Sequence, residues 1–315
     1  MRRRRFLIGS GMLGGMGLLG ACSSPVPFDE ARIRREYPPI GEFTEAHGLR
    51  VHYWDRGEGQ PIVLIHGASG NLRDWTFDVA PRLAETYRVI VFDRPGFGYS
   101  DRPAVNGWDP AVQARVLQEA SRSIGVENPI VIGHSWGGAV AMAWALDYPR
   151  QTLGVVPVSA VTIPYGGLAT IVHAIGLDGV IVNAYMDHLL ERAREGGIAE
   201  FIARVFRPQR VPDGYVDHVG ATLALRERTL RANGEDLQNI NVALRRLAPR
   251  YPSVSVPVEI IHGEADFIDW DDQAAVLAQR VPSARMTLLP GVGHMAHHAA
   301  PYELEGAIER VLERA

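Results

Sequence analysis

The pentapeptide Gly133-His134-Ser135-Trp136-Gly137 constrains this chain more than any other stretch. It follows an apolar run over 129–132 that is typical of a buried strand, and it leads into a helical pattern over 139–146. A serine on so sharp a turn exposes its hydroxyl to a substrate, and glycines flank it because the turn leaves no room for side chains. The pentapeptide alone is common by chance, so its strand-turn-helix setting carries the interpretation. We therefore predict a nucleophile elbow with Ser135 as the nucleophile.

Composition bounds the architecture. A chain of 315 residues with 46% hydrophobic content can bury a large core as one domain with an insertion, or as two domains. The net charge is -4, no lysine is present, and the arginines beyond the N-terminus are scattered among acids, which predicts no nucleic-acid groove. The single cysteine, Cys22, excludes an intrachain disulfide framework and a cysteine-built metal cluster.

The first 21 residues have the order of an export signal. Four arginines at 2–5 precede an apolar, glycine-rich stretch, and small residues stand just before Cys22. The stretch resembles a twin-arginine signal ending in a lipobox, which implies cleavage before Cys22 and lipidation of its sulfur. A plain transmembrane anchor is the alternative, but the apolar stretch is shorter than the ~20 residues a span needs. We expect an exported lipoprotein of the bacterial cell envelope, anchored to a membrane by lipid, and the sequence does not indicate its oligomeric state.

The segment 22–40 contains several prolines and mixed charges, so we expect a tether with little order. Beyond it, apolar strand-like runs alternate with helical patterns over 41–160 and again over 251–315. This alternation predicts an α/β fold, with a mostly parallel sheet and helices on both faces. The expected strands are 50–54, 62–65, 88–92, 129–132, 152–159, 256–262 and 286–289, and the expected helices of these two stretches are 73–85, 110–124, 139–146 and 301–314.

Residues 161–250 interrupt this alternation with helical periodicity. We expect three to five helices there, with breaks near 196–197, Pro208, Pro212 and Gly234. A helical cap inserted into an α/β domain would have this pattern. The cap is rich in Ile, Val, Leu and Tyr, which favours an apolar pocket beneath it, although these residues could also form only the core of the cap.

Five short stretches occur in a fixed order along the chain, and together they carry a family resemblance. They are His66-Gly67 after a strand, residues 93–100, the elbow, residues 263–266 and residues 291–294. In this order they resemble the cap-bearing branch of the α/β-hydrolase superfamily, which includes esterases, carbon-carbon bond hydrolases, haloalkane dehalogenases and epoxide hydrolases. The resemblance covers residues 41–315 apart from the cap, and it implies an α/β-hydrolase fold.

The resemblance also implies a catalytic triad, because members of this superfamily carry Ser, acid and His in that order. The matching residues are Ser135, Asp266 and His294. Asp266 has the family spacing after Gly263, and His294 follows a Gly-x-Gly loop. The rival acids belong to what we interpret as a solvated loop and a helix start. They are Glu264, Asp269, Asp271 and Asp272.

Two further histidines, His297 and His298, compete with His294 for the role of base. Neither follows the Gly-x-Gly loop, so we expect them to flank the site or face solvent. A metal site is not expected, because adjacent rings should point apart and no carboxylate-histidine helical pair is evident. His66 and His134 are interpreted as structural or as lining the site.

Two backbone N–H groups are expected to bind the oxyanion. One belongs to Trp136 at the start of the helix after the elbow, where the helix dipole assists. The other belongs to Ala68, which follows the His-Gly pair. Only the N–H matters at this position, so the Ala68 side chain carries little information.

A serine nucleophile forms an acyl-enzyme, whereas the dehalogenases and epoxide hydrolases need an aspartate at this position. We therefore expect hydrolysis of a small or medium apolar carboxylic ester, without a cofactor. A carbon-carbon bond hydrolase of a vinylogous diketone, a lactonase and a perhydrolase remain alternatives, since fold analogy does not separate them. A ligand-binding protein on a hydrolase scaffold is the alternative outside enzymes.

Overall fold

The computed structural model describes residues 29–166, 184 and 197–315. The expected export signal over 1–21, Cys22 and the first residues of the expected tether, 23–28, lie outside this range, as do most residues of the first half of the expected cap. Among the described residues, no helix has the length and apolar character needed to span a membrane.

Eight strands form one sheet in the order β1-β2-β4-β3-β5-β6-β7-β8. The pairs β1–β2 and β2–β4 are antiparallel and every other pair is parallel, which confirms the mostly parallel sheet. The first strand was not expected from the sequence, since its residues EFTEA are mostly polar and only its last side chain is buried. The strands are β1 Glu42–Ala46, β2 Leu49–Arg56, β3 Pro61–Ile65, β4 Arg88–Phe92, β5 Ile130–His134, β6 Gly154–Val158, β7 Val258–Gly263 and β8 Ala284–Leu289.

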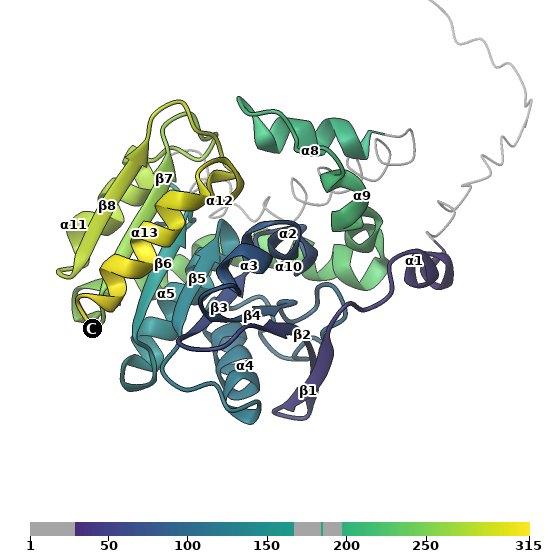
Figure 1. The fold of residues 1–315 in the computed structure, drawn as a ribbon, viewed down its shortest axis with the longest axis horizontal. Coiled ribbons are helices and arrows are strands. Elements are labelled where there is room, and N and C mark those ends of the chain that lie inside the picture. Colours follow the sequence, from purple (N-terminus) through teal and green to yellow (C-terminus); the bar gives the residue numbers. More distant parts are fainter. Residues whose placement is uncertain (1–28, 167–183, 185–196) are drawn as a thin grey trace, which may run out of the picture.

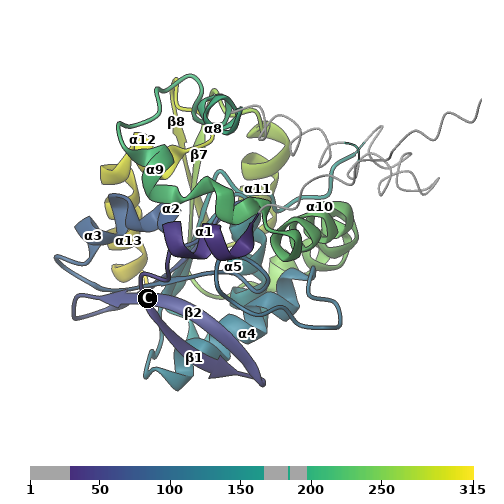
Figure 2. The same cartoon turned by 90° about the vertical axis from the view of Figure 1, so that its right-hand side faces the viewer.

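The central strands are apolar throughout because both faces of the sheet are covered. Successive side chains of a strand point to opposite faces, so Val63 and Ile65 of β3 join one core while Ile62 and Leu64 join the other. Helices α4 (Pro110–Ser123), α5 (Trp136–Asp147) and α11 (Val276–Arg280) pack on the first face. Helices α2 (Arg73–Thr76), α3 (Val79–Leu83) and α13 (Pro301–Leu312) pack on the second, and Figure 2 shows α3 and α13 on the side of the sheet away from α5.

Two local expectations outside the helical insertion were wrong. The expected helix over 73–85 is two short helices, α2 and α3, separated at Phe77 and Asp78. The expected disordered tether contains helix α1 (Glu30–Glu36), whose first turn is capped by the Asp29 side chain. Ile33 of this helix is buried against Tyr99 and Leu223, and this long-range packing, invisible in the local composition, holds the segment in place.

Between β6 and β7 the described chain is helical, as expected from its periodicity. We call residues 197–253 the helical segment. It contains α8 (Ile198–Phe206), α9 (Tyr215–Val219) and α10 (Glu227–Leu247), together with the 3-10 helices η2 (Ala221–Leu225) and η3 (Ala248–Ser253). The remaining elements are η1 (Pro149–Gln151), the π-helical turn η4 (Asp271–Ala275) and α12 (Ala296–Ala299).

The expected helix break at Gly234 is absent, because α10 runs through it. A glycine inside a helix costs about 1 kcal/mol relative to alanine. Here the cost is offset by a buried face with side chains at helical spacing, from Thr229 and Asn233 through Asp236 and Ile240 to Leu244. Tertiary burial thus overrides the local propensity.

The loops that follow β3, β4, β5, β7 and β8 all lie at the carboxyl edge of the parallel strands, since parallel strands end on the same side. The helical segment lies beyond this edge, with α8 and α9 above the strands (Figure 1). In folds of this type the carboxyl edge is where ligands bind. All five stretches that carried the sequence resemblance meet there.

The elbow after β5 has no space for side chains at its glycines. A Cβ on Gly133 would lie 2.2 Å from the Gly137 carbonyl oxygen, and one on Gly137 would lie 2.5 Å from the Ile65 carbonyl oxygen. Both neighbours are backbone atoms and cannot yield. The close approach of α5 to β5 and β3 therefore depends on these two glycines.

The variant Gly133→Ala should destabilise the fold, because its methyl group clashes with backbone on the adjacent turn. We expect the free energy of unfolding by urea to fall by about 1–3 kcal/mol or more. The matched control is Gly306→Ala on α13, whose Cβ would meet only the flexible end of Arg310 at 3.2 Å. The control should change stability by less than about 1 kcal/mol, and equal losses in the two variants would contradict the steric argument.

Candidate active site

A cavity of about 570 Å³ lies at the carboxyl edge of the sheet. Its floor is formed by the loops after β3, β5 and β8, and its walls include residues of α8, α9 and α10. Ser135, His294, Ala68 and Trp136 all line it. The structure therefore brings four of the five residues expected at the site to one cavity, and the fifth, Asp266, contacts it through His294.

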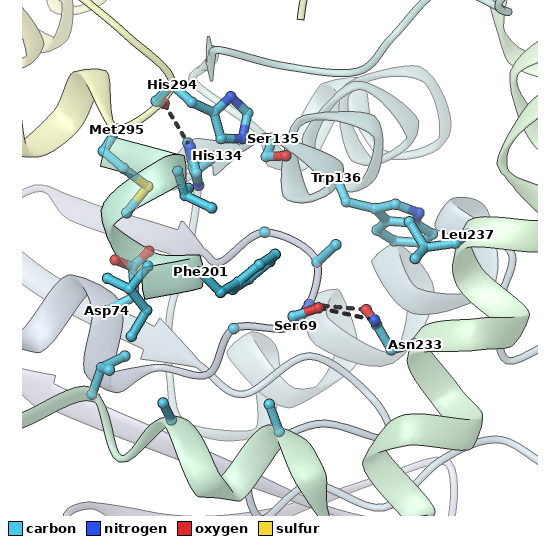
Figure 3. Close-up of a pocket in the computed structure, with 18 of the residues that line it drawn as sticks. Ser69, Asp74, His134, Ser135, Trp136, Phe201, Asn233, Leu237, His294 and Met295 are labelled. Carbon is cyan, nitrogen blue, oxygen red and sulfur yellow. Dashed lines mark hydrogen bonds between the residues drawn. The ribbon is translucent and has the colours of Figure 1, made fainter. Parts of the chain in front are cut away.

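Ser135 stands at the turn between β5 and α5 with φ 53° and ψ -119°. Positive φ is uncommon for a residue with a side chain and costs of order 1–3 kcal/mol. The neighbouring strand β6 and the chain after it enforce this conformation, since the Ser135 N–H donates to Val158 O at 2.9 Å and the Val161 N–H donates to Ser135 O at 3.1 Å. The result is a serine that is 8% exposed and lies on the cavity wall (Figure 3).

His294 and Asp266 form a buried pair. The Nδ1 of His294 lies 2.9 Å and 3.0 Å from the two carboxylate oxygens of Asp266. Burial raises the pKa of Asp266, but hydrogen bonds from His262 and His294 more than offset this, and the pKa falls well below its ordinary value. Asp266 is thus ionised at neutral pH and fixes the His294 ring with Nδ1 protonated, which leaves Nε2 as the basic nitrogen.

The His294 ring lies beside Ser135 in the cavity (Figure 3). Within the described part of the chain, the Ser135 hydroxyl forms no hydrogen bond with that ring. Such bonds are often long or misaligned before substrate binds, and they tighten in the reacting complex. The three side chains thus follow one another in the order Ser135, His294, Asp266, and the Asp266 carboxylate orients the His294 ring from the side away from Ser135.

Two backbone N–H groups of cavity-lining residues have no acceptor among the described residues. Trp136 is the first residue of α5, so its N–H has no intrahelical partner. The Ala68 N–H likewise donates to no acceptor among the described residues. Both residues line the cavity together with Ser135. A positive helix terminus and a free loop amide are suited to binding a developing negative charge.

His66 supports the loop that carries Ala68 and does not line the cavity. Its Nδ1 donates to Gly67 O at 2.9 Å, and its Nε2 accepts from the Arg94 backbone N–H at 3.0 Å. Burial lowers the pKa of His66 to about 4, so the ring is neutral. The interpretation of His66 as structural is consistent with these contacts.

A row of histidine rings begins at the cavity wall, which His294 and His134 line, and continues through His297 to His298. The ring centroids of His294 and His134 are 4.7 Å apart, those of His134 and His297 are 4.4 Å apart, and those of His297 and His298 are 4.2 Å apart. The expectation that the rings of His297 and His298 point apart was wrong, because the short helix α12 lets both reach the same buried carboxylate. That carboxylate belongs to Asp74.

Asp74 joins this row to the helical segment. It accepts hydrogen bonds from Tyr215 Oη on α9 at 2.7 Å, from His298 Nε2 at 3.0 Å and from His297 Nε2 at 3.2 Å. The opposite ring nitrogen of His298 lies 2.8 Å from Asp78. Burial alone would lower the pKa of His298, but these two carboxylates raise it to about 9. His298 is therefore an imidazolium at neutral pH.

The same cluster bears on the expectation that no metal binds here. Among the described residues, donor atoms of Asp74, His134 and His297 lie within 4.8 Å of one another, a spacing that suits a metal ion. One Asp74 oxygen, Oδ1, already accepts from Tyr215 and from the cationic His298, and the other, Oδ2, accepts from His297. We interpret the group as a hydrogen-bonded network that ties together α2, α12 and α9.

Some residues around the site were not expected from the sequence. His262, at the end of β7, lies 3.3 Å from the Asp266 carboxylate and supports it from a second side. Its only sequence signal is a histidine just before the Gly263–Asp266 stretch. Arg94 could also have been noticed in the sequence, because it is a charged residue within the family-like stretch 93–100. No local sequence pattern indicates Asn233 or Asp236, because their partners Ser69 and Arg94 lie 164 and 142 residues away in the chain.

Comparison with known proteins agrees with this fold. A family model described as alpha/beta hydrolase fold matches residues 60–301. The chain is 24% identical over 254 residues to a 2-hydroxy-6-oxo-6-phenylhexa-2,4-dienoate hydrolase of Burkholderia cepacia, covering 79% of this chain and 86% of that protein.

Solved structures give the same fold. A meta-cleavage product hydrolase from Pseudomonas fluorescens IP01 superposes with a TM-score of 0.70 at 22% identity, covering 87% of this chain and 98% of the other. An esterase from Exiguobacterium antarcticum superposes with a TM-score of 0.67 at 23% identity, covering 86% of this chain and 99% of the other.

The pH dependence of stability should report on His298. Its pKa of about 9 in the folded protein exceeds the ordinary value near 6.5, so its protonation stabilises the fold. The stabilisation is fully present below about pH 6.5 and is lost as the pH rises through about 9. We expect the free energy of urea unfolding to decrease by up to ~3 kcal/mol across this window.

The variant His298→Gln should flatten that decrease, whereas His47→Asn, at an exposed histidine, should leave it unchanged. His66 does not add to the change in stability between pH 6.5 and 9, because its pKa of about 4 places its effect on stability at lower pH. A decrease in His298→Gln as steep as in the unmodified protein would contradict the assignment.

Proposed function

This chain belongs to the alpha/beta hydrolase fold family, and on that basis we propose that it is a serine hydrolase that cleaves a small or medium apolar carboxylic ester. One observation carries the proposal: Ser135, on a strained turn, shares one cavity with the ring of a buried His294–Asp266 pair and with two N–H groups, of Ala68 and Trp136, that have no acceptor among the described residues. These are the parts that acyl transfer needs.

In the proposed mechanism, Ser135 Oγ attacks the ester carbonyl carbon while His294 Nε2 takes the hydroxyl proton. The carbonyl oxygen becomes an oxyanion that accepts hydrogen bonds from the Ala68 and Trp136 N–H groups. The C–O bond then breaks, and the imidazolium gives its proton to the leaving alcohol. The ionised Asp266 stabilises that imidazolium, and this acid-base step commonly contributes roughly 10² to 10⁴ in rate.

The second half of the cycle uses the same groups. Water attacks the acyl-enzyme carbonyl while His294 removes a proton from it, and collapse of the second tetrahedral intermediate returns the proton to Ser135. The carboxylic acid is released, and the enzyme is regenerated. Apart from the ester and water, the steps use the side chains and backbone amides of the site.

The cavity lining supports a neutral, apolar substrate. The walls from α8 and α10 contribute mainly aliphatic and aromatic side chains, among them Phe201, Leu237 and Ile240. Among the described lining residues the carboxyl groups are those of Asp74 and Asp269, and no arginine is present. A carboxylate on the substrate would therefore enter a cavity whose described walls offer no guanidinium to receive it.

Carbon-carbon bond hydrolysis is a second candidate, because two of the similar proteins are hydrolases of this kind, the dienoate hydrolase and the meta-cleavage product hydrolase. The same serine, base and acid can serve it. The substrate of the dienoate hydrolase is a carboxylate by its name, which fits the acidic lining described above less well than a neutral ester does. Lactones are cyclic esters and fall within the first proposal.

Replacing the proposed nucleophile tests the mechanism. Ser135→Ala should abolish covalent labelling by a fluorophosphonate and reduce turnover of p-nitrophenyl esters by at least about 10³-fold, because no acyl-enzyme can form. Mass mapping should locate the adduct of the unmodified protein on Ser135. Ser253→Ala, at an exposed serine outside the cavity, is the matched control and should label and turn over normally.

The outcomes separate the candidates. Turnover that peaks within a series of ester chain lengths, with no cleavage of a vinylogous dienoate, supports the esterase. Efficient dienoate cleavage with slow ester turnover would replace it by the carbon-carbon bond hydrolase. Full activity in Ser135→Ala would overturn both, and an unlabelled, inactive but folded protein would favour a ligand-binding scaffold.

We further propose that the protein is exported and anchored to a membrane through lipidated Cys22, as its N-terminal sequence predicts. Cys22→Ser should then release the protein from membranes into the soluble fraction in the native host, while ester turnover stays unchanged because the cysteine lies far along the chain from the site. Membrane fractionation with an acyl-chain label measures this. Retention of Cys22→Ser on membranes would contradict a lipid anchor.

A further inference from the structure

Helix α10 makes polar contacts with the loop that carries Ala68. Asn233 and Asp236 stand three residues apart on its buried face, and both side chains are almost completely buried. Polar side chains in such a position need partners, because an unpaired buried polar group is costly. Their partners are the loop over 66–69 and the arginine that supports it.

Asn233 binds Ser69 twice. The Ser69 backbone N–H donates to Asn233 Oδ1 at 2.9 Å, and Asn233 Nδ2 donates to Ser69 Oγ at 2.9 Å (Figure 3). Ser69 has φ 56°, a conformation that residues other than glycine rarely adopt. Such a conformation persists only where the surroundings fix it. Asn233 therefore fixes the residue immediately after Ala68.

Asp236 acts on the other side of Ala68 through Arg94. The Arg94 guanidinium donates to Asp236 Oδ2 at 2.8 Å, to His66 O at 3.0 Å and to Gly67 O at 3.1 Å. Both members of this ion pair are fully buried. Without Asp236, the Arg94 charge would lack its carboxylate partner in a water-excluded site.

The contact with Gly67 O is the important one, because the Gly67 carbonyl and the Ala68 N–H belong to one planar peptide group. Anchoring the oxygen of that group fixes the direction in which its N–H points. His66 Nδ1 also donates to Gly67 O. In addition, the Arg94 guanidinium carbon lies 4.4 Å from the centroid of the Trp136 ring, so the same arginine contacts the residue that carries the second N–H.

We propose that Asn233 and Asp236 of α10 are positioning residues for the oxyanion donor Ala68, so that the helical segment is part of the catalytic unit and not only its roof. Asn233 holds the chain after Ala68, and Asp236 holds the peptide before it by way of Arg94. This inference rests on the proposed function for its catalytic meaning, while the mechanical link between α10 and the loop stands on the contacts alone.

A consequence concerns opening of the site. The carboxylate of Asp236 also accepts from Arg102 at 2.9 Å, and Asn233 closes two hydrogen bonds to the loop. Moving α10 away from the sheet would break these buried contacts together. Substrate entry must therefore leave α10 in place.

The test uses Asn233→Ala with Asn239→Ala as the matched control. Asn239 is on the same helix, but among the described residues its side chain bonds only to Glu235 O of that helix. The first readout is hydrogen-deuterium exchange of the intact protein over residues 66–70. Exchange there should accelerate in Asn233→Ala, because Ser69 loses its acceptor, and should be unchanged in Asn239→Ala.

The second readout is kinetic. In Asn233→Ala we expect kcat for a p-nitrophenyl ester to fall by about 10-fold to 100-fold. The ratio of oxoester to thionoester turnover should fall as well. Sulfur accepts hydrogen bonds poorly, so a thionoester depends little on the Ala68 N–H. An oxoester loses the hydrogen bond to its oxyanion when that N–H is misplaced. A merely structural role would lower the amount of folded enzyme without moving this ratio.

Each outcome has a distinct meaning. Unchanged exchange over 66–70 would overturn the link between α10 and the loop, and accelerated exchange with an unchanged oxoester to thionoester ratio would overturn its role in oxyanion binding. If the unmodified protein neither labels nor turns over esters, the proposed function fails, while the exchange result still decides the link. Asp236→Asn, if it folds, should shift the ratio in the same direction as Asn233→Ala.

Discussion

The backbone turn at Ser135 is the constraint on which the rest of the site depends. A serine at φ 53° is held there by β6 on one side and by α5 packed tightly against β5 on the other. Gly133 and Gly137, two residues away on either side, have no room for a Cβ, so the close approach of helix and sheet coincides with the proposed nucleophile. The strain is tolerated because the core on both faces of the sheet fixes the two elements that flank it.

Buried charges gather at the same edge of the sheet, and each has a partner. Asp266 is held by two histidines, Arg94 by Asp236, and Asp74 by His298 and Tyr215. A charge removed from water is costly unless it is paired and hydrogen-bonded. These pairs therefore specify how the loops of the carboxyl edge sit relative to one another, and they make stability depend on pH through groups that lie close to the cavity.

The helical segment contributes to this edge in two ways. Its apolar side chains line the cavity. Its polar side chains form hydrogen bonds with the residues around the sheet edge: Tyr215 of α9 donates to Asp74, and Asp236 of α10 accepts from Arg94. Substrate preference and the geometry of the oxyanion site would then be linked, since the same helices affect both. Variation in α10 would be expected to alter rate as well as selectivity.

Much of this architecture could be predicted from local sequence, because its signals are local. Apolar strand runs bounded by turn residues marked seven of the eight strands, and glycines at the elbow marked the turn that needs them. The order of short motifs identified Ser135, Asp266 and His294 as candidates, and the structure brings Asp266 and His294 within hydrogen-bond distance. Such patterns span only a few residues, because backbone sterics and side-chain periodicity act between residues that are close in the sequence.

The tertiary structure decided what depends on distant partners. Helix α1 is ordered by packing on Tyr99 and Leu223, and α10 runs through Gly234 because its other residues are buried. The pairing of Asn233 with Ser69 joins residues 164 positions apart, and no local pattern announces it. Sequence thus determined which chemical groups the chain offers and which elements carry them. Only folding decided which of these groups meet, because burial and long-range hydrogen bonding are properties of the packed chain.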